Sequence, residues 1–319
     1  MKITITSEEA GQRFDRFLRK YLKNYDITLS QIFQLIRKGK TKVNNQKKPN
    51  NYKINIGDQI YIHPEIKKLN QTKQEKVKNI NQTYIKQLII YEDINWIFFN
   101  KPAKTPTQSG TKQENKITMI DILRRYTTSK SKTFSPMFGF RLDIDTTGII
   151  VAAKNYNALK YLNHIIKQRQ TDKKYIAILS GHLDEKITVK KNLYRKYDKK
   201  VGKDLSFPDD NGDYAKSIFE PIQNQQIYGE NITLAKVKII TGRMHQIRAH
   251  AKYIGTPIIG DLLYGEQATN NLFLKKLGIN RQLLHCYKYS FYDKFQGKQI
   301  SIKSNYPKDF EKLFKTYEE

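Results

Sequence analysis

An apolar run preceded by two carboxylates constrains the fold of this chain more than any other segment. Residues 149–153 carry no polar side chain, a pattern typical of a short buried strand. Asp143 and Asp145 come just before it, separated from it by a turn at residues 146–148. Arg141 lies at the same strand entrance, where it can keep a carboxylate ionised and contact a phosphate or a base. The segment therefore predicts a functional site whose carboxylate serves as a nucleophile or a metal ligand.

The charge of the chain indicates the class of partner. Lys and Arg number 58 against 30 Asp and Glu, which gives a net charge of +28. Such an excess is typical of proteins that neutralise phosphates, so we expect a nucleic-acid partner. Part of the lysine content is also what an AT-rich coding sequence produces, because Asn, Ile and Tyr are abundant too. Charge and domain organisation together therefore indicate the nucleic-acid partner.

Cysteine content and hydropathy indicate the compartment. The single cysteine, Cys286, rules out an internal disulfide and any multi-cysteine zinc site, and it fits a reducing cytosol. The first residues lack a hydrophobic signal core, and the longest apolar runs are too short to span a bilayer. We expect a cytoplasmic protein without a membrane partner, and a monomer as the simplest state.

The pattern of the 319 residues predicts two domains of an α+β protein. Residues 1–64 read as a small module with two helices and short strands, residues 65–83 as a polar linker, and residues 84–319 as a larger domain on a mixed or antiparallel sheet. In the larger domain the strand candidates are residues 88–91, 96–99, 175–179, 232–240, 287–291 and 299–302, and the helix candidates are residues 120–126 and 158–167.

The small module resembles the S4 RNA-binding domain. The resemblance rests on Arg13-Phe14-Asp15, on the segment from Ile36 to Asn44, and on Gly57-Asp58. Cations would gather around the second helix and the turn after it, where they can follow a phosphate backbone. The cations expected to bind RNA are Arg37, Lys38, Lys40 and Lys42.

A glycine-led segment at residues 241–250 carries further polar groups. Met244, Ile247, Ala251 and Ile254 recur at helical spacing, which predicts a helix with a buried stripe. His245 and His250 are five residues apart and lack the i, i+4 spacing of a zinc-binding helix, so we expect no metal site.

Together the segments of the larger domain resemble the RluA-type pseudouridine synthases, and their arrangement looks most like the RluC-like branch. The resemblance covers nearly the whole chain, and its order and spacing are specific although each motif alone is weak. It is carried by Arg141-Leu142-Asp143 with Asp145-Thr146-Thr147-Gly148, Lys173 with Tyr175 and Gly181, Gly242-Arg243 with His245-Gln246-Ile247-Arg248 and His250, Asn100-Lys101-Pro102, Gly260-Asp261 with Tyr264-Gly265, and Leu284-His285.

This resemblance implies isomerisation of uridine to pseudouridine in RNA, most simply large-subunit ribosomal RNA, without cofactor or metal. Asp143 would be the catalytic carboxylate and Arg248 its ion-pair partner. Tyr175 would stack on the uracil and could move a proton. Arg141 would fill the gap left by the flipped uridine, which costs a few kcal/mol to extrude. The apolar walls against the base would be Ile247 and Leu284.

Several alternatives and departures remain beside this interpretation. Asp145 competes with Asp143 for the carboxylate role, although an Asx turn or cap near Thr147 is the interpretation we favour for it. Phe140 and Lys104 stand where the family commonly has a histidine and a glycine. The alternative functions are a synthase acting on transfer RNA, a non-catalytic RNA-binding or ribosome-assembly protein, and a metal-dependent phosphate enzyme.

Overall fold

The computed structural model describes residues 1–7, 9–22, 27, 29–64, 77, 79–108, 116–127, 135–199 and 201–314. The chain divides into two compact units, one of Met1–Ile80 with Gln108–Asp121 and one of Asn81–Thr107 with Ile122–Glu319. Most of the predicted linker lies outside the described residues, and its last residues begin helix α5 (Gln82–Leu88). The strand expected from residue 88 therefore starts at the end of that helix, as β4 (Ile89–Glu92).

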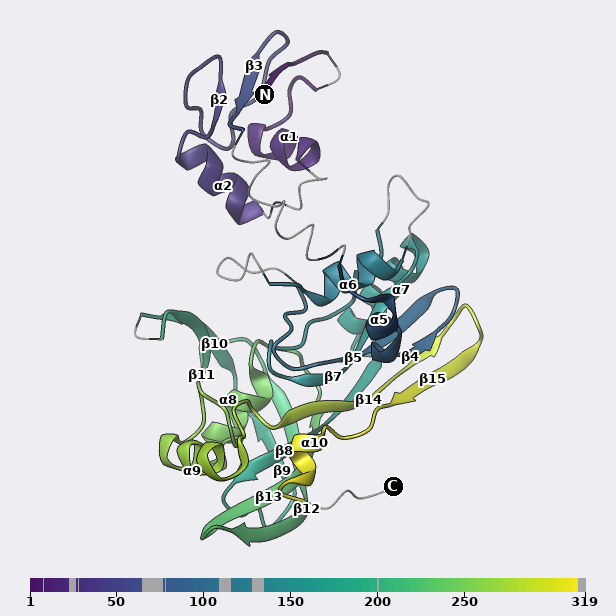
Figure 1. Cartoon of the computed structure of the whole chain (residues 1–319), viewed down its shortest axis with the longest axis vertical. Coiled ribbons are helices and arrows are strands. Elements are labelled where there is room, and N and C mark those ends of the chain that lie inside the picture. Colours follow the sequence, from purple (N-terminus) through teal and green to yellow (C-terminus); the bar gives the residue numbers. More distant parts are fainter. Residues whose placement is uncertain are drawn as a thin grey trace. The chain divides into compact units, whose positions relative to one another are not determined.

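The first unit contains a three-stranded antiparallel sheet of order β1-β3-β2, with two helices (Figure 1). The helical spacing read from the sequence is confirmed, because Phe14, Leu18 and Ile32 are all buried in one core. Burying side chains of this size contributes about 1.5–3 kcal/mol each. The elements are β1 (Lys2–Thr4), α1 (Phe14–Tyr21), α2 (Leu29–Arg37), β2 (Thr41–Val43) and β3 (Gln59–Ile62).

The Gly57-Asp58 pair of the first unit makes a fixed turn into β3. The buried Asp58 carboxylate accepts hydrogen bonds from the Asn55 backbone N–H (2.8 Å), the Asn44 amide (2.7 Å) and the Tyr52 hydroxyl (3.1 Å). Gly57 has φ 85°, a left-handed conformation that glycine adopts without steric cost. The motif therefore has a structural explanation within this unit.

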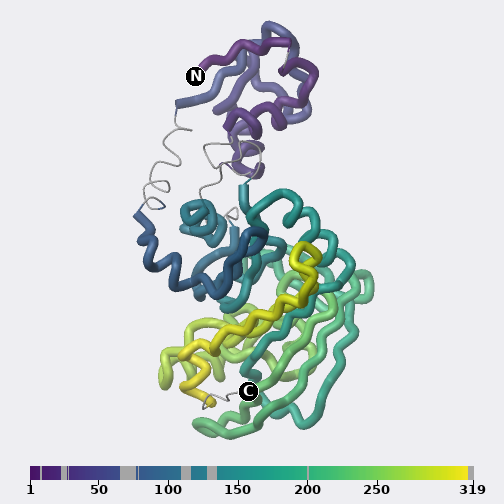
Figure 2. The backbone as a smooth tube through the Cα atoms, turned by 90° about the vertical axis from the view of Figure 1, so that its right-hand side faces the viewer, coloured from purple at the N-terminus to yellow at the C-terminus, as the bar shows by residue number. Residues whose placement is uncertain are grey.

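The second unit is built on a mixed ten-stranded sheet (Figures 1 and 2). Its main path is β4-β5-β7-β14-β8-β13-β12-β9, while β15 pairs with β14 and β6 with β7. Only the β7–β14 pair is parallel among the described strands, so the expected α+β class with a mixed sheet is confirmed. The remaining strands of the unit are β5 (Trp96–Lys101), β6 (Met137–Phe138), β7 (Thr147–Ala153), β8 (Thr171–Ser180), β9 (Ile187–Lys190), β10 (Leu193–Asp198), β11 (Lys203–Pro208), β12 (Lys216–Ile227), β13 (Glu230–Ile239), β14 (Leu284–Asp293) and β15 (Lys298–Lys303).

Strand β7 lies inside the sheet, between β5 and β14, and all seven of its residues are buried, as the apolar run predicted. Gly148 adopts φ 111° and lies against the backbone of Cys286 in β14. A Cβ atom at this position would stand 2.3 Å from the Cys286 carbonyl oxygen, so only glycine allows the two strands to approach. The close approach of β7 and β14 therefore places the loop that precedes β7, which contains Asp143, next to the central strands of the sheet.

Helices in the second unit pack around the sheet, and β10 and β11 form a separate two-stranded hairpin (Figure 1). No helix in the described part of the chain is long and apolar enough to cross a membrane. The other helices that the structure describes are α6 (Met119–Tyr126), α7 (Tyr156–Lys167), α8 (Gln246–Tyr253), α9 (Gln267–Leu277) and α10 (Lys308–Glu311).

The helix predicted around residue 247 differs from the expected amphipathic pattern. Helix α8 is buried at every position from Gln246 to Ala251, so no single stripe faces the core. Met244 precedes the helix and Ile254 follows it as the C-cap. His245 occupies the N-cap in a left-handed conformation, φ 52°, rather than continuing a helical turn. The reason for this arrangement is the set of polar contacts made by this helix, which spacing alone does not indicate.

Candidate active site

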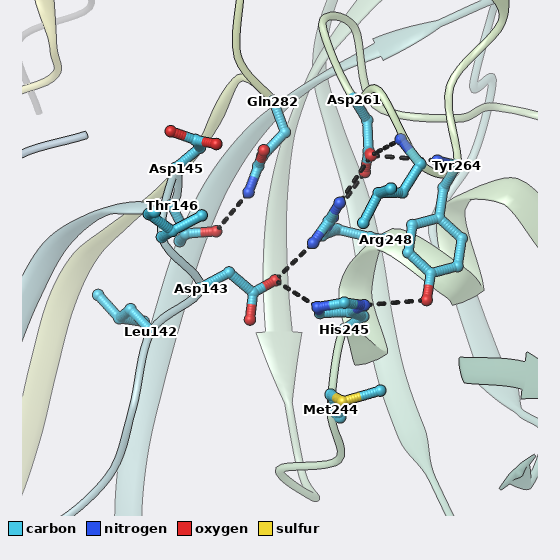
Figure 3. A network of polar contacts seen from close by, with 12 residues as sticks. Leu142, Asp143, Asp145, Thr146, Met244, His245, Arg248, Asp261, Tyr264 and Gln282 are labelled. Carbon is cyan, nitrogen blue, oxygen red and sulfur yellow. Dashed lines mark hydrogen bonds and ion pairs between the residues drawn. The ribbon is translucent and has the colours of Figure 1, made fainter. Parts of the chain in front are cut away.

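The carboxylate of Asp143 lies beside helix α8 at the entrance to β7 (Figure 3). Its Oδ2 atom accepts a hydrogen bond from NH1 of Arg248 at 2.9 Å, and Nε2 of His245 lies 3.8 Å from the same oxygen. The Asp143 side chain is 27% exposed, whereas that of Arg248 is 5% exposed. The partly exposed carboxylate of Asp143 is thus paired with the buried guanidinium of Arg248.

Arg248 is itself fixed by Asp261, which lies in the loop after residue 260. Nε of Arg248 donates to Oδ2 of Asp261 at 2.6 Å and NH2 donates to Oδ1 at 2.8 Å, a bidentate pair. The Arg248 guanidinium also lies over the ring of Tyr264, 5.0 Å from its centroid. The guanidinium therefore divides its donors between a buried carboxylate behind it and Asp143 in front, as Figure 3 shows.

Two further buried cations hold the backbone of the Asp143 loop. Nζ of Lys101 donates to the carbonyl of Ile144 at 2.8 Å, and NH1 of Arg281 donates to the carbonyl of Asp145 at 3.1 Å. Lys101 is fully buried, and burial lowers its pKa to about 7. Its ammonium also donates to the carbonyls of two residues in the neighbouring loop, Pro102 and Thr105. These contacts give the Asn100-Lys101-Pro102 motif a structural role beside the site.

The charges around Asp143 favour its ionised form. Burial alone would raise the pKa of this carboxyl group, but His245, when protonated in the acid range, and Arg248 outweigh it and place the pKa below its usual value. Burial lowers the pKa of His245 below 6.5, so this imidazole is neutral at pH 7. At neutral pH the site therefore contains one carboxylate, one guanidinium and one neutral imidazole in contact range.

His245 and Tyr264 belong to motifs that the sequence displays, but we assigned neither residue a role in the site. Nδ1 of His245 lies 3.0 Å from the Tyr264 hydroxyl, whose oxygen accepts the backbone N–H of Ser206 at 2.7 Å. Ser206 belongs to β11, and its hydroxyl donates to the carbonyl of Met244 at 2.6 Å. In the sequence, the contact between His245 and Tyr264 is indicated only by the position of the histidine between the two arginines of the 242–248 segment.

Tyr175 lies in β8 opposite Cys286 of β14, and it is 5% exposed. Burial, with the negative charge of Asp143 adding to it, raises the pKa of Tyr175 well above its usual value. At neutral pH this side chain is therefore a protonated phenol and not a phenolate.

Phe140, the first departure from the family pattern, packs in the same region. Its ring stacks on Tyr289 with centroids 5.1 Å apart, and Nζ of Lys173 lies 4.5 Å from the Phe140 centroid. Lys104, the second departure, has φ 60°, the left-handed conformation in which glycine is the usual residue. Both positions are thus accommodated locally, by packing and by an uncommon but allowed backbone conformation.

Asp145 does not make the local turn that we favoured for it. Its Oδ1 atom accepts the backbone N–H of Lys104 at 3.2 Å, and no bond from Asp145 to the Thr147 backbone occurs among the described residues. Thr147 instead uses its hydroxyl with Nδ1 of His285, at 2.8 Å. The expected Asx turn is therefore wrong, and the hydrogen-bond partner of the Asp145 carboxylate lies in a distant loop.

The other predicted site residues fall into three groups. Arg141 is exposed next to the Asp143 loop, whereas Ile247 and Leu284 are buried in the second unit. The expected RNA-binding cations belong to the first unit, where Arg37 and Lys38 are exposed and Lys40 and Lys42 are half-buried. Within the described part of the chain no group of three or more His, Cys, Asp or Glu could hold a metal ion.

Comparison with known proteins identifies the family. The family model described as RNA pseudouridylate synthase matches residues 95–253, which include Asp143, Tyr175 and Arg248. A protein of Buchnera aphidicola subsp. Baizongia pistaciae is 30% identical over 316 residues, covering 98% of this chain and 95% of the relative. The chain belongs to the RNA pseudouridine synthase family. The expected membership of its RluA-type branch is thereby confirmed.

Three relatives of this pseudouridine synthase share one name. The Buchnera protein and one from Escherichia coli strain K12 are each called "Ribosomal large subunit pseudouridine synthase C". The E. coli protein is 28% identical over 305 residues, covering 95% of this chain and 92% of its own. A Haemophilus ducreyi protein of the same name is 31% identical over 323 residues, covering 98% and 90%.

Solved structures share the fold of this synthase. "Human RNA Pseudouridylate Synthase Domain Containing 1" matches with a TM-score of 0.57 and 21% identity, covering 69% of this chain and 83% of the human chain. "Human RNA Pseudouridylate Synthase Domain Containing 4" matches with a TM-score of 0.57 and 21% identity, covering 74% and 95%. At this identity the likeness concerns the fold, and it agrees with the mixed sheet of the second unit.

Proposed function

We propose that this pseudouridine synthase isomerises uridines of large-subunit ribosomal RNA, with Asp143 as the catalytic carboxylate. The observation that carries the proposal is the Asp143–Arg248 ion pair, in a chain whose relatives are named for that RNA. A carboxylate fixed by a buried guanidinium is ionised and aimed, as a group that attacks or stabilises the sugar or base must be.

The proposed reaction breaks the bond between N1 of uracil and C1′ of the ribose, and it forms a bond between C5 and C1′. After C5 has joined C1′, the C5 proton leaves and N1 takes up a proton from water, so the reaction is an isomerisation without net oxidation. Tyr175 stacks on the uracil and, as a protonated phenol, offers an O–H group beside it. Arg141 is exposed, as a residue that enters the gap of a flipped uridine must be. Ile247 and Leu284 are the apolar walls against the base.

A comparison of RNA substrates tests the target assignment. Ribosomal and transfer RNA transcripts are labelled with [5-³H]uridine and incubated separately with the full chain, and the tritium released to water is counted. Each isomerisation releases one tritium, so we expect release from the ribosomal transcript with several turnovers per protein. Release confined to transfer RNA would favour the transfer-RNA alternative. Binding of either RNA without release would favour the non-catalytic alternative.

We also propose that residues 1–64, within the first unit, act as an S4-like RNA-binding domain, and that a cytoplasmic monomer carries out the reaction. The exposed Arg37 and Lys38 at the end of α2 support the first proposal. Deleting residues 1–64 is expected to weaken RNA binding and to flatten its salt dependence, while tritium release continues slowly. Unchanged affinity after the deletion would contradict the binding role.

A further inference from the structure

The two oxygens of Asp143 have different surroundings. Oδ2 accepts from Arg248 and faces Nε2 of His245, whereas Oδ1 has no hydrogen-bond partner among the described residues. Figure 3 shows both contacts of Asp143 leading to the same oxygen. A carboxylate held at one oxygen presents the other in a defined direction, so the group that holds Oδ2 also sets the position of Oδ1.

His245 can add to this hold only if Nε2 carries a proton. The contacts of Tyr264 favour this protonation state, because its hydroxyl oxygen accepts the N–H of Ser206 at 2.7 Å and its own proton needs an acceptor. Burial raises the pKa of Tyr264 to about 12, so its hydroxyl remains protonated at neutral pH. The one hydrogen-bond acceptor for that proton among the described residues is Nδ1 of His245, 3.0 Å away. A hydroxyl that donates to Nδ1 requires this nitrogen to be unprotonated, which places the proton of the neutral imidazole on Nε2.

We infer that His245 is a positioning residue, whose Nε2–H, fixed by Tyr264 and Ser206, holds Oδ2 of Asp143 together with Arg248 and thereby presents Oδ1 to the substrate. The 3.8 Å separation in the free protein shortens to a hydrogen bond when the substrate engages Oδ1, since contacts of this kind tighten in the reacting complex. The expected effect of His245 on the reaction rate rests on the proposed function, whereas the position of the proton on its ring does not.

The test of the tautomer needs no activity. The six histidines of the full chain are labelled with ¹⁵N, and the His245 ring signals are assigned by their loss in His245→Asn. We expect Nε2 to carry the proton at pH 7, and we expect Tyr264→Phe to abolish that preference. Tyr194→Phe removes the hydroxyl of an exposed tyrosine in β10 and is the matched control, without effect on His245. The charged and titratable groups facing His245 in this experiment are Asp143, Arg248, Asp261, Lys203 and Tyr264.

A proton on Nδ1, or a doubly protonated ring at pH 7, would overturn the inference. A wild-type Nε2–H form that survives unchanged in Tyr264→Phe would overturn the role given to Tyr264. Either result is obtained whether or not the protein modifies the RNA chosen for the assay.

The kinetic consequence is tested by tritium release with two substitutions of one residue. In His245→Gln the side-chain amide can still donate near the position of Nε2, whereas in His245→Leu no donor remains. We expect kcat to fall about 10- to 100-fold in His245→Leu, the scale of a misplaced catalytic group, with KM unchanged. His245→Gln should recover part of kcat. Equal losses in both variants, or a change confined to KM, would refute positioning, and no release by the wild type would refute the proposed function instead.

Discussion

Replacing Asp261 by Asn tests whether the buried pair behind Arg248 holds the site together. The Asp261 side chain is fully buried and that of Arg248 is 5% exposed, and two N–O distances of 2.6 and 2.8 Å join them. The same carboxylate accepts the backbone N–H groups of Leu263 and Tyr264. The substitution preserves the shape of the side chain but leaves the guanidinium without its main counter-charge.

Removing one partner of a buried ion pair costs about 3–5 kcal/mol, because the remaining charge is uncompensated. For a unit of this size, each kcal/mol lowers the melting temperature by about 2–4 °C, so we expect a drop of about 6–20 °C. Activity should fall together with stability, since Arg248 loses the contact that orients it toward Asp143. The two effects share one cause and should appear in the same variant.

The chain provides its own probe and its own control for this measurement. Its single tryptophan, Trp96, is fully buried in β5, so tryptophan fluorescence follows the unfolding of the second unit. Asp204→Asn removes an equally short Arg–Asp contact, the 2.6 Å pair with Arg195, at an exposed position. An exposed pair contributes about 0–1 kcal/mol, so this control should change little. If both variants melt at the same temperature, the argument that Asp261 supports Arg248 is refuted.

Three further predictions concern the centre of the sheet and the site. Burial raises the pKa of the Cys286 thiol to about 12, so a thiol reagent at pH 8 should modify it only after unfolding, and rapid labelling of the native protein would contradict this. Gly148→Ala should destabilise the second unit by about 3 kcal/mol or more in urea unfolding, through strain and contact with Cys286. The control is Gly229→Ala, because Gly229 also has a left-handed φ of 83° but no atom lies within 4 Å of an added Cβ; it should cost about 1–2 kcal/mol. Equal losses of stability in the two variants would exclude a contribution from the contact with Cys286. The pKa of Asp143 in the folded protein is lowered from 3.8, so its ionised form stabilises the fold. The stability advantage of the wild type over Asp143→Asn should be fully present above about pH 4 and should be lost as the pH falls through the lowered pKa. An advantage that grows on acidification would contradict this prediction.

The sequence predicted the elements that are most apolar and the residues that stand in motifs. The strand after Gly148 and the strand containing Tyr175 were expected and are present, because central strands of a mixed sheet are continuous apolar runs. Strands β9 to β12 were not expected, since many of their residues are exposed and polar and lack a clean period of two. Helix α5 was taken as linker and strand for the same reason, because one buried residue, Ile85, gives no periodicity.

The site was predicted as a set of residues but not as a network. The Arg248–Asp261 pair joins residues 13 apart, and the His245–Tyr264 contact joins residues 19 apart. Local spacing says which side chains share a helix or a strand, and it says nothing about which loops meet in space. The family resemblance supplied Asp143, Tyr175 and Arg248 as members of the site, but neither it nor the spacing indicated how Lys101 and Arg281 hold the Asp143 loop.

The role of Asp143 is tested most directly by comparing two aspartates that are two residues apart. Tritium release from [5-³H]uridine-labelled ribosomal RNA is measured for the wild type, Asp143→Asn and Asp145→Asn. Asp143 is held by Arg248, whereas Asp145 accepts the Lys104 backbone N–H. We expect the wild type and Asp145→Asn to release tritium over many turnovers and Asp143→Asn to release none. Release by Asp143→Asn at the wild-type rate, or its loss only in Asp145→Asn, would contradict the assignment of Asp143 as the catalytic carboxylate.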